Sequence, residues 1–202
     1  MARLKAAGLL DGLFLAGGSA VAHHLAHRVS NDLDLFSPDQ GFDVDQLRRR
    51  ASATIDAEVI AQSDATLKLR LSGAVVDFVR YPYPSLGRPL RGIEGVRVAS
   101  LRDLATMKLA AITKRGVRRD YWDLHEILTS TRLTLAGACR DYVRKYGVSE
   151  SDIYHVLRAL SWFEDAEADP SHPRGLTRKK WREIRDWFAL RAARELVRQT
   201  RS

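Results

Sequence analysis

Two aspartates, Asp32 and Asp34, lie in the segment DLDLF, in which polar and apolar residues alternate. Such alternation predicts a β-strand, and residues two apart in a strand project from the same face. Two carboxylates side by side repel each other, so a fold tolerates them poorly without a cation. Magnesium prefers hard oxygen ligands and can hold triphosphate oxygens as well. The sequence therefore favours a metal site, and the alternative is a solvent-facing strand edge that carries two acids.

A third aspartate, Asp77, lies in the mostly apolar segment AVVDFVRY, on the face that it shares with Val79 and Tyr81. A carboxylate in such a strand is costly unless it is paired or metal-bound. One interpretation is a salt bridge with one of the many arginines. The other is a three-carboxylate site for two metal ions, in which one ion lowers the pKa of an acceptor hydroxyl and the other binds a triphosphate.

A turn that contains two glycines and a serine precedes the acid pair. The predicted strand ends at Ala16, Gly17 and Gly18 follow, and we expect Ser19 to cap the next helix. Glycines let backbone N–H groups approach an anion closely, and a helix N-terminus adds the positive end of its dipole. This pattern predicts a phosphate cradle, although many strand-to-helix turns use the same residues without binding a ligand.

Lys108 interrupts the apolar stripe of a predicted helix, SLRDLATMKLAAITKRG, which opens on a capping-box pattern from Ser100 to Asp103. A lysine on the inner face of a helix needs a partner. A triphosphate is one candidate, and the alternatives are a snorkelling lysine or an internal pair with an aspartate.

Asp120 and Asp123 lie three apart on the next predicted helix, RRDYWDLHEIL, and Asp120 shares a face with Leu124 and Ile127. Asp120 is therefore expected to point inward or along a groove. In one interpretation an aspartate orients Lys108 or the nucleotide while the neighbouring arginines meet phosphate. In the other, the aspartates and arginines pair with one another and join the two helices.

The elements that must position these residues divide the chain into an α/β half and a helical half. In the first half, polar and apolar patterning predicts strands over 14–16, 32–36, 66–73, 74–82 and 96–100, and helices over 19–28 and 43–52. In the second half it predicts helices over 100–116, 118–128, 135–147 and 151–163, and a linker over 164–175. The final helix carries an apolar stripe typical of core packing: Trp181, Ile184, Phe188, Ala192 and Leu196. We predict a nucleotide-binding α/β core over 1–99 and a helical region over 100–202 that packs on it and completes the active site.

Composition restricts the class of protein. The chain has 202 residues and a formal net charge of +8, and none of its apolar runs approaches the length of a membrane helix. The basic excess favours a polyanionic partner such as nucleic acid, and an Arg-rich genomic bias is the alternative. The single cysteine, Cys139, cannot form an internal disulfide, which fits a reducing cytoplasm. We interpret it as a small buried side chain rather than a nucleophile.

Three runs in order, GGSAVAHHLAHRVSNDLDLF, VDFVRY and SLRDLATMKLAAITKRGVRRDYWDL, resemble the AbiEii/AbiGii-type nucleotidyltransferase toxins, a family that includes the MenT-like enzymes. The resemblance extends from about Leu15 to Leu128. It implies an α+β fold, with a polymerase-β-like nucleotidyltransferase core, a mixed twisted sheet flanked by helices, followed by a helical C-terminal part.

The resemblance also implies roles for the residues already singled out. Asp32 and Asp34 match the metal-binding acid pair of the family, Asp77 matches the third acid of the wider superfamily, and Lys108 matches a lysine that contacts the nucleotide. Residues implied in nucleotide binding are Gly17, Gly18 and Ser19 in the turn, Lys108, and the later motif of Arg119, Asp120 and Asp123. Before the acid pair, His27 and Arg28 are interpreted as phosphate contacts or as local caps.

The function implied by the resemblance is transfer of a nucleoside monophosphate from a nucleoside triphosphate such as ATP to an RNA, most simply the 3′ end of tRNA, with release of pyrophosphate. Mg²⁺ is the implied cofactor, with Mn²⁺ as an alternative, and the implied partner is a cognate antitoxin. The basic run Arg178, Lys179, Lys180, Arg182 and Arg185 suits a phosphate backbone or a solvated helix face. Alternative functions are transfer to a protein or small-molecule acceptor, and a non-catalytic module that binds nucleic acid or a partner.

Overall fold

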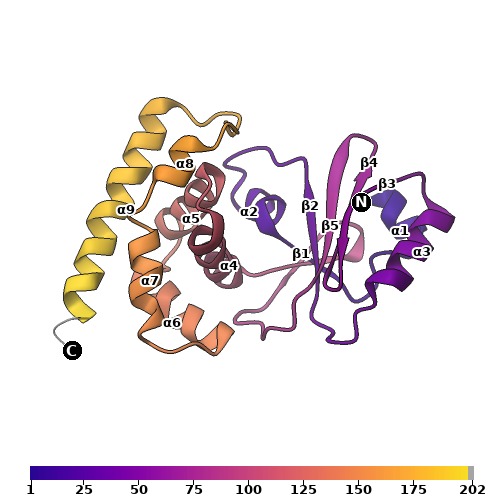
Figure 1. Cartoon of the computed structure of the whole chain (residues 1–202), viewed down its shortest axis with the longest axis horizontal. Helices are drawn as coiled ribbons and strands as arrows, with labels where there is room; N and C mark the ends of the chain where they lie inside the picture. Colours follow the sequence, from indigo (N-terminus) through magenta and orange to yellow (C-terminus); the bar gives the residue numbers. More distant parts are fainter. Residues whose placement is uncertain (200–202) are drawn as a thin grey trace. The chain divides into compact units, whose positions relative to one another are not determined.

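The computed structural model describes residues 1–199 (Figure 1). Within these residues the chain forms two compact units, each described here by itself. The sheet unit comprises Met1–His23 and Val29–Ser100, and the helical unit comprises His24–Arg28 and the chain from Leu101 onward. Consequently the short segment His24–Arg28 belongs to the helical unit, although both of its flanks belong to the sheet unit.

The sheet unit is built on one mixed sheet of seven strands in the order β3-β4-β5-β2-β1-β7-β6. Its strands are β1 Phe14–Ala16, β2 Leu33–Ser37, β3 Glu58–Ser63, β4 Thr66–Leu71, β5 Ala74–Arg80, β6 Leu90–Arg91 and β7 Arg97–Val98. Strand β5 runs parallel to β2, and β7 runs parallel to β1, whereas the other neighbouring pairs are antiparallel. Its helices are α1 Ala2–Ala6, α2, which begins at Gly17 and ends at Leu25, α3 Val44–Thr54 and the 3-10 turn Ile93–Gly95.

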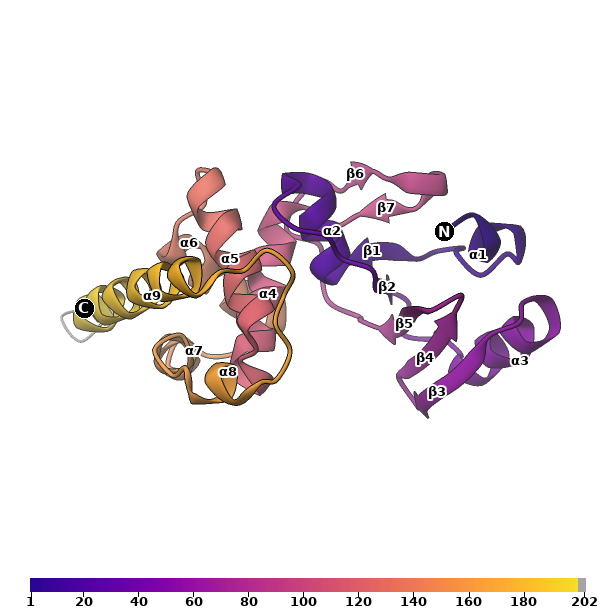
Figure 2. The same ribbon diagram turned by 90° about the horizontal axis from the view of Figure 1, so that it is seen from above.

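The two faces of this sheet differ in burial because side chains alternate along each strand. One face is apolar and buried, and it carries Leu15, Leu35, Leu67, Leu69, Val76 and Phe78. Helices α1 and α3 lie on one side of the sheet and the start of α2 on the other (Figures 1 and 2). The opposite face, which carries Phe14, Asp34, Phe36 and Asp77, is only half-buried. This second face is the one that can meet a ligand.

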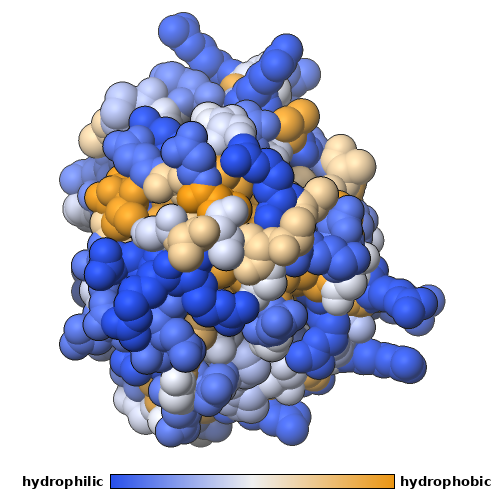
Figure 3. Space-filling model, turned by 90° about the vertical axis from the view of Figure 1, so that its right-hand side faces the viewer, coloured by the Kyte–Doolittle hydropathy of each residue, from blue (hydrophilic) through white to orange (hydrophobic). Residues whose placement is uncertain are grey.

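The side of the sheet unit that carries α1 and α3 is mainly hydrophilic on its outside. Figure 3 shows this side, where a narrow band of hydrophobic residues crosses a largely hydrophilic surface. In the edge strand β3, Val59 and Ile60 are exposed apolar side chains. No helix within residues 1–199 is both long and apolar enough to span a membrane.

The helical unit contains α4 Leu101–Arg115, α5 Arg118–Ser130, α6 Leu135–Tyr146, α7 Asp152–Ala159, α8 Glu164–Ala168 and α9 Arg178–Gln199. Helix α6 is capped at its start by the Thr134 side chain, which accepts a hydrogen bond from Gly137 N. It ends at Gly147, whose φ of 62° suits a residue without a side chain. Buried residues of α9 confirm the predicted stripe for Trp181, Ile184, Phe188 and Ala192, and Leu196 is half-buried.

The structure corrects several predicted elements. Strand β3 was not predicted, because every one of its residues is exposed and no burial alternation marks it. The predicted linker contains the short helix α8. Ser19 does not cap a helix, since α2 begins two residues earlier, at Gly17. The predicted arrangement of a mixed sheet with helices followed by a helical remainder is confirmed.

Candidate functional site

A row of charged side chains crosses the half-buried face of the sheet. Asp34 of β2 and Asp77 of β5 are direct neighbours in the parallel register of these strands. On the far side of Asp77, its register partner in β4 is Lys68, and on the far side of Asp34, its partner in β1 is Ala16. We call Asp34 and Asp77 the carboxylate row. Two like charges opposite each other on adjacent strands are unfavourable unless a cation offsets them.

The carboxylate of Asp34 lies directly over Gly17, the first residue of α2. A Cβ atom at Gly17 would come within 1.8 Å of Asp34 Oδ2, and the φ of Gly17 is 62°. Both the space and the backbone conformation therefore require glycine at this turn. The sequence predicted a glycine here for the approach of an anion, and the structure adds the packing of Asp34 as a second reason.

The carboxylate of Asp77 is only partly satisfied. Asp77 Oδ2 lies 3.1 Å from Lys68 Nζ. Asp77 Oδ1 is buried and has no hydrogen-bond partner within residues 1–199. A buried acceptor without a partner carries a desolvation cost of about 1–3 kcal/mol. The predicted arginine partner of this residue is instead a lysine, and one carboxylate oxygen remains available to a ligand.

Asp32 precedes β2 and is held apart from the carboxylate row. Its Oδ1 accepts a long hydrogen bond of 3.4 Å from the main-chain N–H of Val75. In the described part of the chain, no group of three or more His, Cys, Asp or Glu side chains is arranged to hold a metal ion. Of the three predicted ligands, Asp34 and Asp77 are direct neighbours in register, and Asp32 accepts from Val75 N.

These residues nevertheless suit a divalent cation by their chemistry. The donors are hard carboxylate oxygens, which Mg²⁺ and Mn²⁺ prefer. One carboxylate oxygen of Asp77 has no hydrogen-bond donor within residues 1–199, and a bound cation would take the place of that donor. Because Gly17 has no side chain, the carboxylate of Asp34 can lie directly against the turn. The donor set therefore fits the metal that the sequence predicted.

Ser19 connects the glycine turn to the start of β2. Its hydroxyl donates a short hydrogen bond to the main-chain oxygen of Asp32 and lies 3.1 Å from the Ser30 hydroxyl. The preceding residue, Gly18, is buried in the first turn of α2. The first N–H groups of a helix lack intrahelical acceptors, so this turn keeps the donors that an anion requires.

The helical unit contains a second group of charged residues, centred on Lys108 of α4. Its Nζ lies 2.7 Å from Asp120 Oδ1 and 2.7 Å from Asp123 Oδ2, both on α5. Lys108 is 5% exposed and both aspartates are 0% exposed. Burial alone would lower the pKa of Lys108, but the charges of the two aspartates outweigh it and raise that pKa. The internal pair that the sequence left open is therefore present.

Asp123 has further partners in the segment His24–Arg28. Its Oδ1 lies 2.8 Å from His27 Nε2 and accepts a hydrogen bond of 2.6 Å from Arg28 Nε, while its Oδ2 accepts one of 2.8 Å from Arg28 Nη2. Burial alone would raise the pKa of Asp123, but Lys108 and the hydrogen bonds from Arg28 and His27 hold it well below its usual range. His27 and Arg28, interpreted from sequence as phosphate contacts or caps, are partners of Asp123.

The arginines around α5 have different environments. Arg115 Nε donates to Asp120 Oδ2 at 3.2 Å, and together with Lys108 it holds the pKa of Asp120 below its ordinary value despite burial. Arg118 is buried and donates to the main-chain oxygens of residues 167 and 169. Arg119, the predicted nucleotide-binding residue, is exposed.

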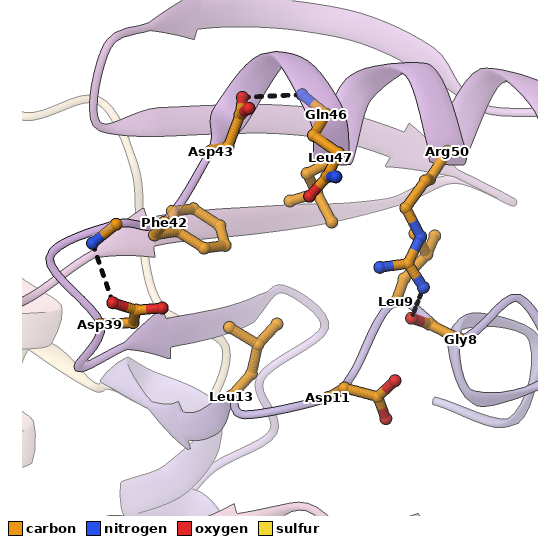
Figure 4. A pocket seen from close by; sticks show the side chains of 11 residues that line it. Gly8, Leu9, Asp11, Leu13, Asp39, Phe42, Asp43, Gln46, Leu47 and Arg50 are labelled. Atoms are coloured by element: carbon orange, nitrogen blue, oxygen red, sulfur yellow. Dashed lines mark hydrogen bonds between the residues drawn. The ribbon is translucent and has the colours of Figure 1, made fainter.

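A separate pocket of the sheet unit contains none of the predicted site residues. Figure 4 shows it between the loop that follows α1 and the start of α3, with three carboxylates, Asp11, Asp39 and Asp43, around it. Two of them serve the local backbone, since Asp39 accepts from Gly41 N and Asp43 caps α3 at Gln46 N. This arrangement is explained by loop and helix structure.

Comparisons with known proteins agree with this fold. The family model described as nucleotidyl transferase AbiEii toxin of a type IV toxin–antitoxin system matches residues 1–190. An uncharacterized protein of Aquifex aeolicus (strain VF5) is 29% identical over 183 residues, which cover 90% of this chain and 86% of that protein. The nucleotidyltransferase toxin MenT4 of Mycobacterium tuberculosis H37Rv is similar in structure, with a TM-score of 0.52 and 16% identity over 95% of this chain and 82% of MenT4. ANT(2")-Ia in complex with adenylyl-2"-tobramycin gives a TM-score of 0.50 and 16% identity over 76% of this chain and 95% of that one.

Proposed function

Because the chain belongs to the AbiEii family of nucleotidyltransferase toxins, we propose that it transfers a nucleoside monophosphate from a nucleoside triphosphate to the 3′ end of tRNA in the cytoplasm. Transfer requires Mg²⁺, or Mn²⁺ in its place, and releases pyrophosphate. A cognate antitoxin restrains the activity, as the name of the family implies.

The observation that carries this proposal is the carboxylate row. Asp34 and Asp77 face each other in register, and one oxygen of Asp77 is buried without a partner. Two adjacent acids, one of them with an oxygen that lacks a partner within residues 1–199, are unfavourable on their own and become favourable when a cation binds. Asp34 and Asp77 would hold the metal, and Asp32 would join them after turning away from Val75 N.

The residues of the sheet unit then have distinct tasks in the reaction. The acceptor hydroxyl oxygen forms a bond to the α-phosphorus, the bond to the bridging oxygen breaks, and pyrophosphate leaves. Asp77 takes the hydroxyl proton, and the N–H groups of Gly18 and Ser19 hold the leaving pyrophosphate. A bound metal ion supplies neutralisation of the phosphate charge and a lower pKa of the hydroxyl. Most of the rate enhancement therefore comes from positioning and electrostatics.

Lys108 supplies positive charge from the helical unit. An ammonium group has three N–H donors, and two of them are directed to Asp120 and Asp123. We propose that Lys108, as the residue that matches the family's lysine, contacts the nucleotide. Its raised pKa keeps Lys108 charged throughout the physiological range. Asp120 and Asp123 act as positioning residues, because they fix the lysine rather than contact the nucleotide.

The test is an incubation of purified protein with Mg²⁺, total tRNA and each α-labelled nucleoside triphosphate in turn. We expect label on tRNA with the wild type and none with Asp34→Asn. Asp64→Asn is the matched control, since Asp64 lies in the exposed turn between β3 and β4 of the same sheet. Omission of metal, or its removal with a chelator, should abolish transfer by the wild type.

Three other outcomes would change the proposal. Equal label with Asp34→Asn and the wild type would remove the carboxylate row from the chemistry. Label on a protein or on a small molecule, but not on tRNA, would keep the reaction and replace the acceptor. Absence of any labelled product with a whole-cell extract would leave only a binding function.

A further inference from the structure

A second row of side chains crosses the same half-buried face of the sheet, next to the carboxylate row. Phe36 of β2 is paired with Phe14 of β1, Phe14 is paired with Arg97 of β7, and Arg97 is paired with Arg91 of β6. Register partners in neighbouring strands point to the same face, so the four side chains form one continuous line. We call Arg91, Arg97, Phe14 and Phe36 the aromatic–arginine row.

Two tyrosines that follow the end of β5, Tyr81 and Tyr83, extend the aromatic end of this row. The ring centroids of Phe14 and Phe36 are 5.8 Å apart, those of Phe36 and Tyr81 are 5.1 Å apart, and those of Tyr81 and Tyr83 are 4.8 Å apart. Phe14, Phe36 and Tyr81 are half-buried, and Tyr83 is 42% exposed. These four successive rings lie on an incompletely covered sheet face, whereas Phe78 on the opposite face is fully buried.

The arginine end of the row is exposed and, in the part of the chain that the structure describes, has no carboxylate partner. Arg91 and Arg97 are both exposed, and within residues 1–199 neither forms an ion pair. Some arginines elsewhere in the chain do have carboxylate partners, as Arg102 does with Asp141. Two neighbouring unpaired guanidinium groups repel each other, and a phosphate between them would offset that repulsion through bidentate hydrogen bonds.

The position of the row along the strands assigns it to one side of the reaction. Phe36 follows Asp34 by two residues in β2, a spacing of about 7 Å, and on the other side of Asp34 β1 leads into Gly17 and α2. In an in-line displacement the attacking and leaving oxygens lie on opposite sides of the phosphorus. If Gly18 and Ser19 hold the leaving pyrophosphate, the aromatic–arginine row lies on the side of the attacking hydroxyl.

We propose that the aromatic–arginine row, extended by Tyr81 and Tyr83, binds the terminal nucleotides of a single-stranded RNA 3′ end and thereby selects the acceptor. Bases stack on the aromatic rings, and Arg91 and Arg97 contact the phosphates between them. This inference rests on the proposed function for the identity of the acceptor as RNA. Aromatic side chains on a sheet face, flanked by basic residues, are a recurrent means of binding unpaired bases. A cationic small molecule is disfavoured, because the two arginines would repel it.

The test measures binding without catalysis, by fluorescence anisotropy of a labelled single-stranded RNA, with neither nucleotide nor metal present. We expect Tyr83→Ala to weaken binding about tenfold, because it removes a stacking surface. Arg97→Ala should weaken binding to a similar extent and reduce the slope of log affinity against log salt by about one. Matched controls are Tyr154→Ala and Arg49→Ala, an exposed tyrosine of α7 and an exposed arginine of α3, which should bind as the wild type does.

A second measurement uses the transfer reaction with the same variants. Arg97→Ala and Tyr83→Ala should raise KM for RNA more than they lower kcat, whereas merely destabilised variants would lose activity in proportion to their folded fraction. Equal affinity of these variants and the controls would overturn the inference while the transfer reaction stood. Stronger binding of duplex RNA than of single strands, or transfer only to a protein, would overturn it as well. RNA binding that depends on the row in a protein that transfers no nucleotide would retain the inference and reject the proposed function.

Discussion

Two pairs of aspartates in this chain have opposite surroundings. Asp34 and Asp77 lie on a half-buried sheet face, where within residues 1–199 Asp77 pairs with Lys68 through one oxygen and its other oxygen has no hydrogen-bond partner. Asp120 and Asp123 are fully buried, and each accepts from at least two cationic side chains. In the first pair Asp77 has an oxygen left for a ligand, whereas both members of the second pair are bound to cationic side chains of the protein.

This difference predicts a role in activity for the first pair of aspartates and a role in stability for the second. A buried carboxylate surrounded by cations is ionised and fixed, so it can hold a lysine or an arginine in place. A carboxylate with an unsatisfied oxygen gains more from a bound cation than it loses in desolvation. We therefore expect substitutions in the first pair to affect activity with little effect on stability, and substitutions in the second pair to affect stability first.

The largest effect is expected for Asp34→Asn. The variant keeps the volume of the side chain over Gly17 but loses one charge of the carboxylate row, so kcat/KM for nucleotide transfer should fall at least about 10³-fold. Its thermal unfolding temperature should stay close to that of the wild type, because relief of repulsion from Asp77 offsets the lost contacts. A large loss of folded protein in circular dichroism would contradict this division of roles.

Asp123→Asn should have the next largest effect, this time on stability. It leaves the positive charges of Lys108 and Arg28 buried with less negative charge beside them. Removal of one partner of a buried ion pair lowers the free energy of unfolding by about 3–5 kcal/mol. Urea unfolding measures the change in the free energy of unfolding, with Glu183→Gln on the exposed face of α9 as control. A change under about 1 kcal/mol would mean that the second pair does not support the helical unit.

The dependence of stability on pH should follow the same pair. The folded-state pKa values of Asp120 and Asp123 lie below the value of about 3.9 for an unfolded chain. Their contribution to stability is therefore complete above that pH and is lost as pH falls through the folded pKa values. Urea unfolding between about pH 5 and pH 2 should show the onset of this loss in the wild type and a smaller one in Asp123→Asn. An identical acid dependence in both proteins would assign it to other carboxylates.

Lys68→Gln should have the smallest effect on stability, because a half-exposed ion pair contributes about 0–1 kcal/mol. It should also lower the concentration of Mg²⁺ that gives half-maximal activity, since Lys68 no longer competes with the metal for Asp77. Titration of transfer activity with Mg²⁺ checks this. An increased requirement for metal would indicate that Lys68 assists binding instead.

Local patterns predicted much of this molecule from sequence. Alternation in DLDLF and AVVDFVRY identified two strands and the side of each that carries an acid, and the motifs identified the family, the class of enzyme and the fold. Pairings between distant segments were beyond local patterns. The register of Asp34 with Asp77 and the contact of Arg28 with Asp123, 95 residues away, depend on tertiary structure. The role of the exposed aromatic rings likewise emerges only when the strand order is known.

The most direct test of the central claim is a binding titration of Mn²⁺, followed by electron paramagnetic resonance, on folded protein in the presence of ATP. We expect the wild type, Asp64→Asn and Asp120→Asn to bind Mn²⁺ with similar affinity, and Asp34→Asn and Asp77→Asn to lose most of that affinity. Unchanged binding in Asp34→Asn and Asp77→Asn, or loss of binding in Asp120→Asn while the protein remains folded, would contradict the assignment of the metal to the carboxylate row.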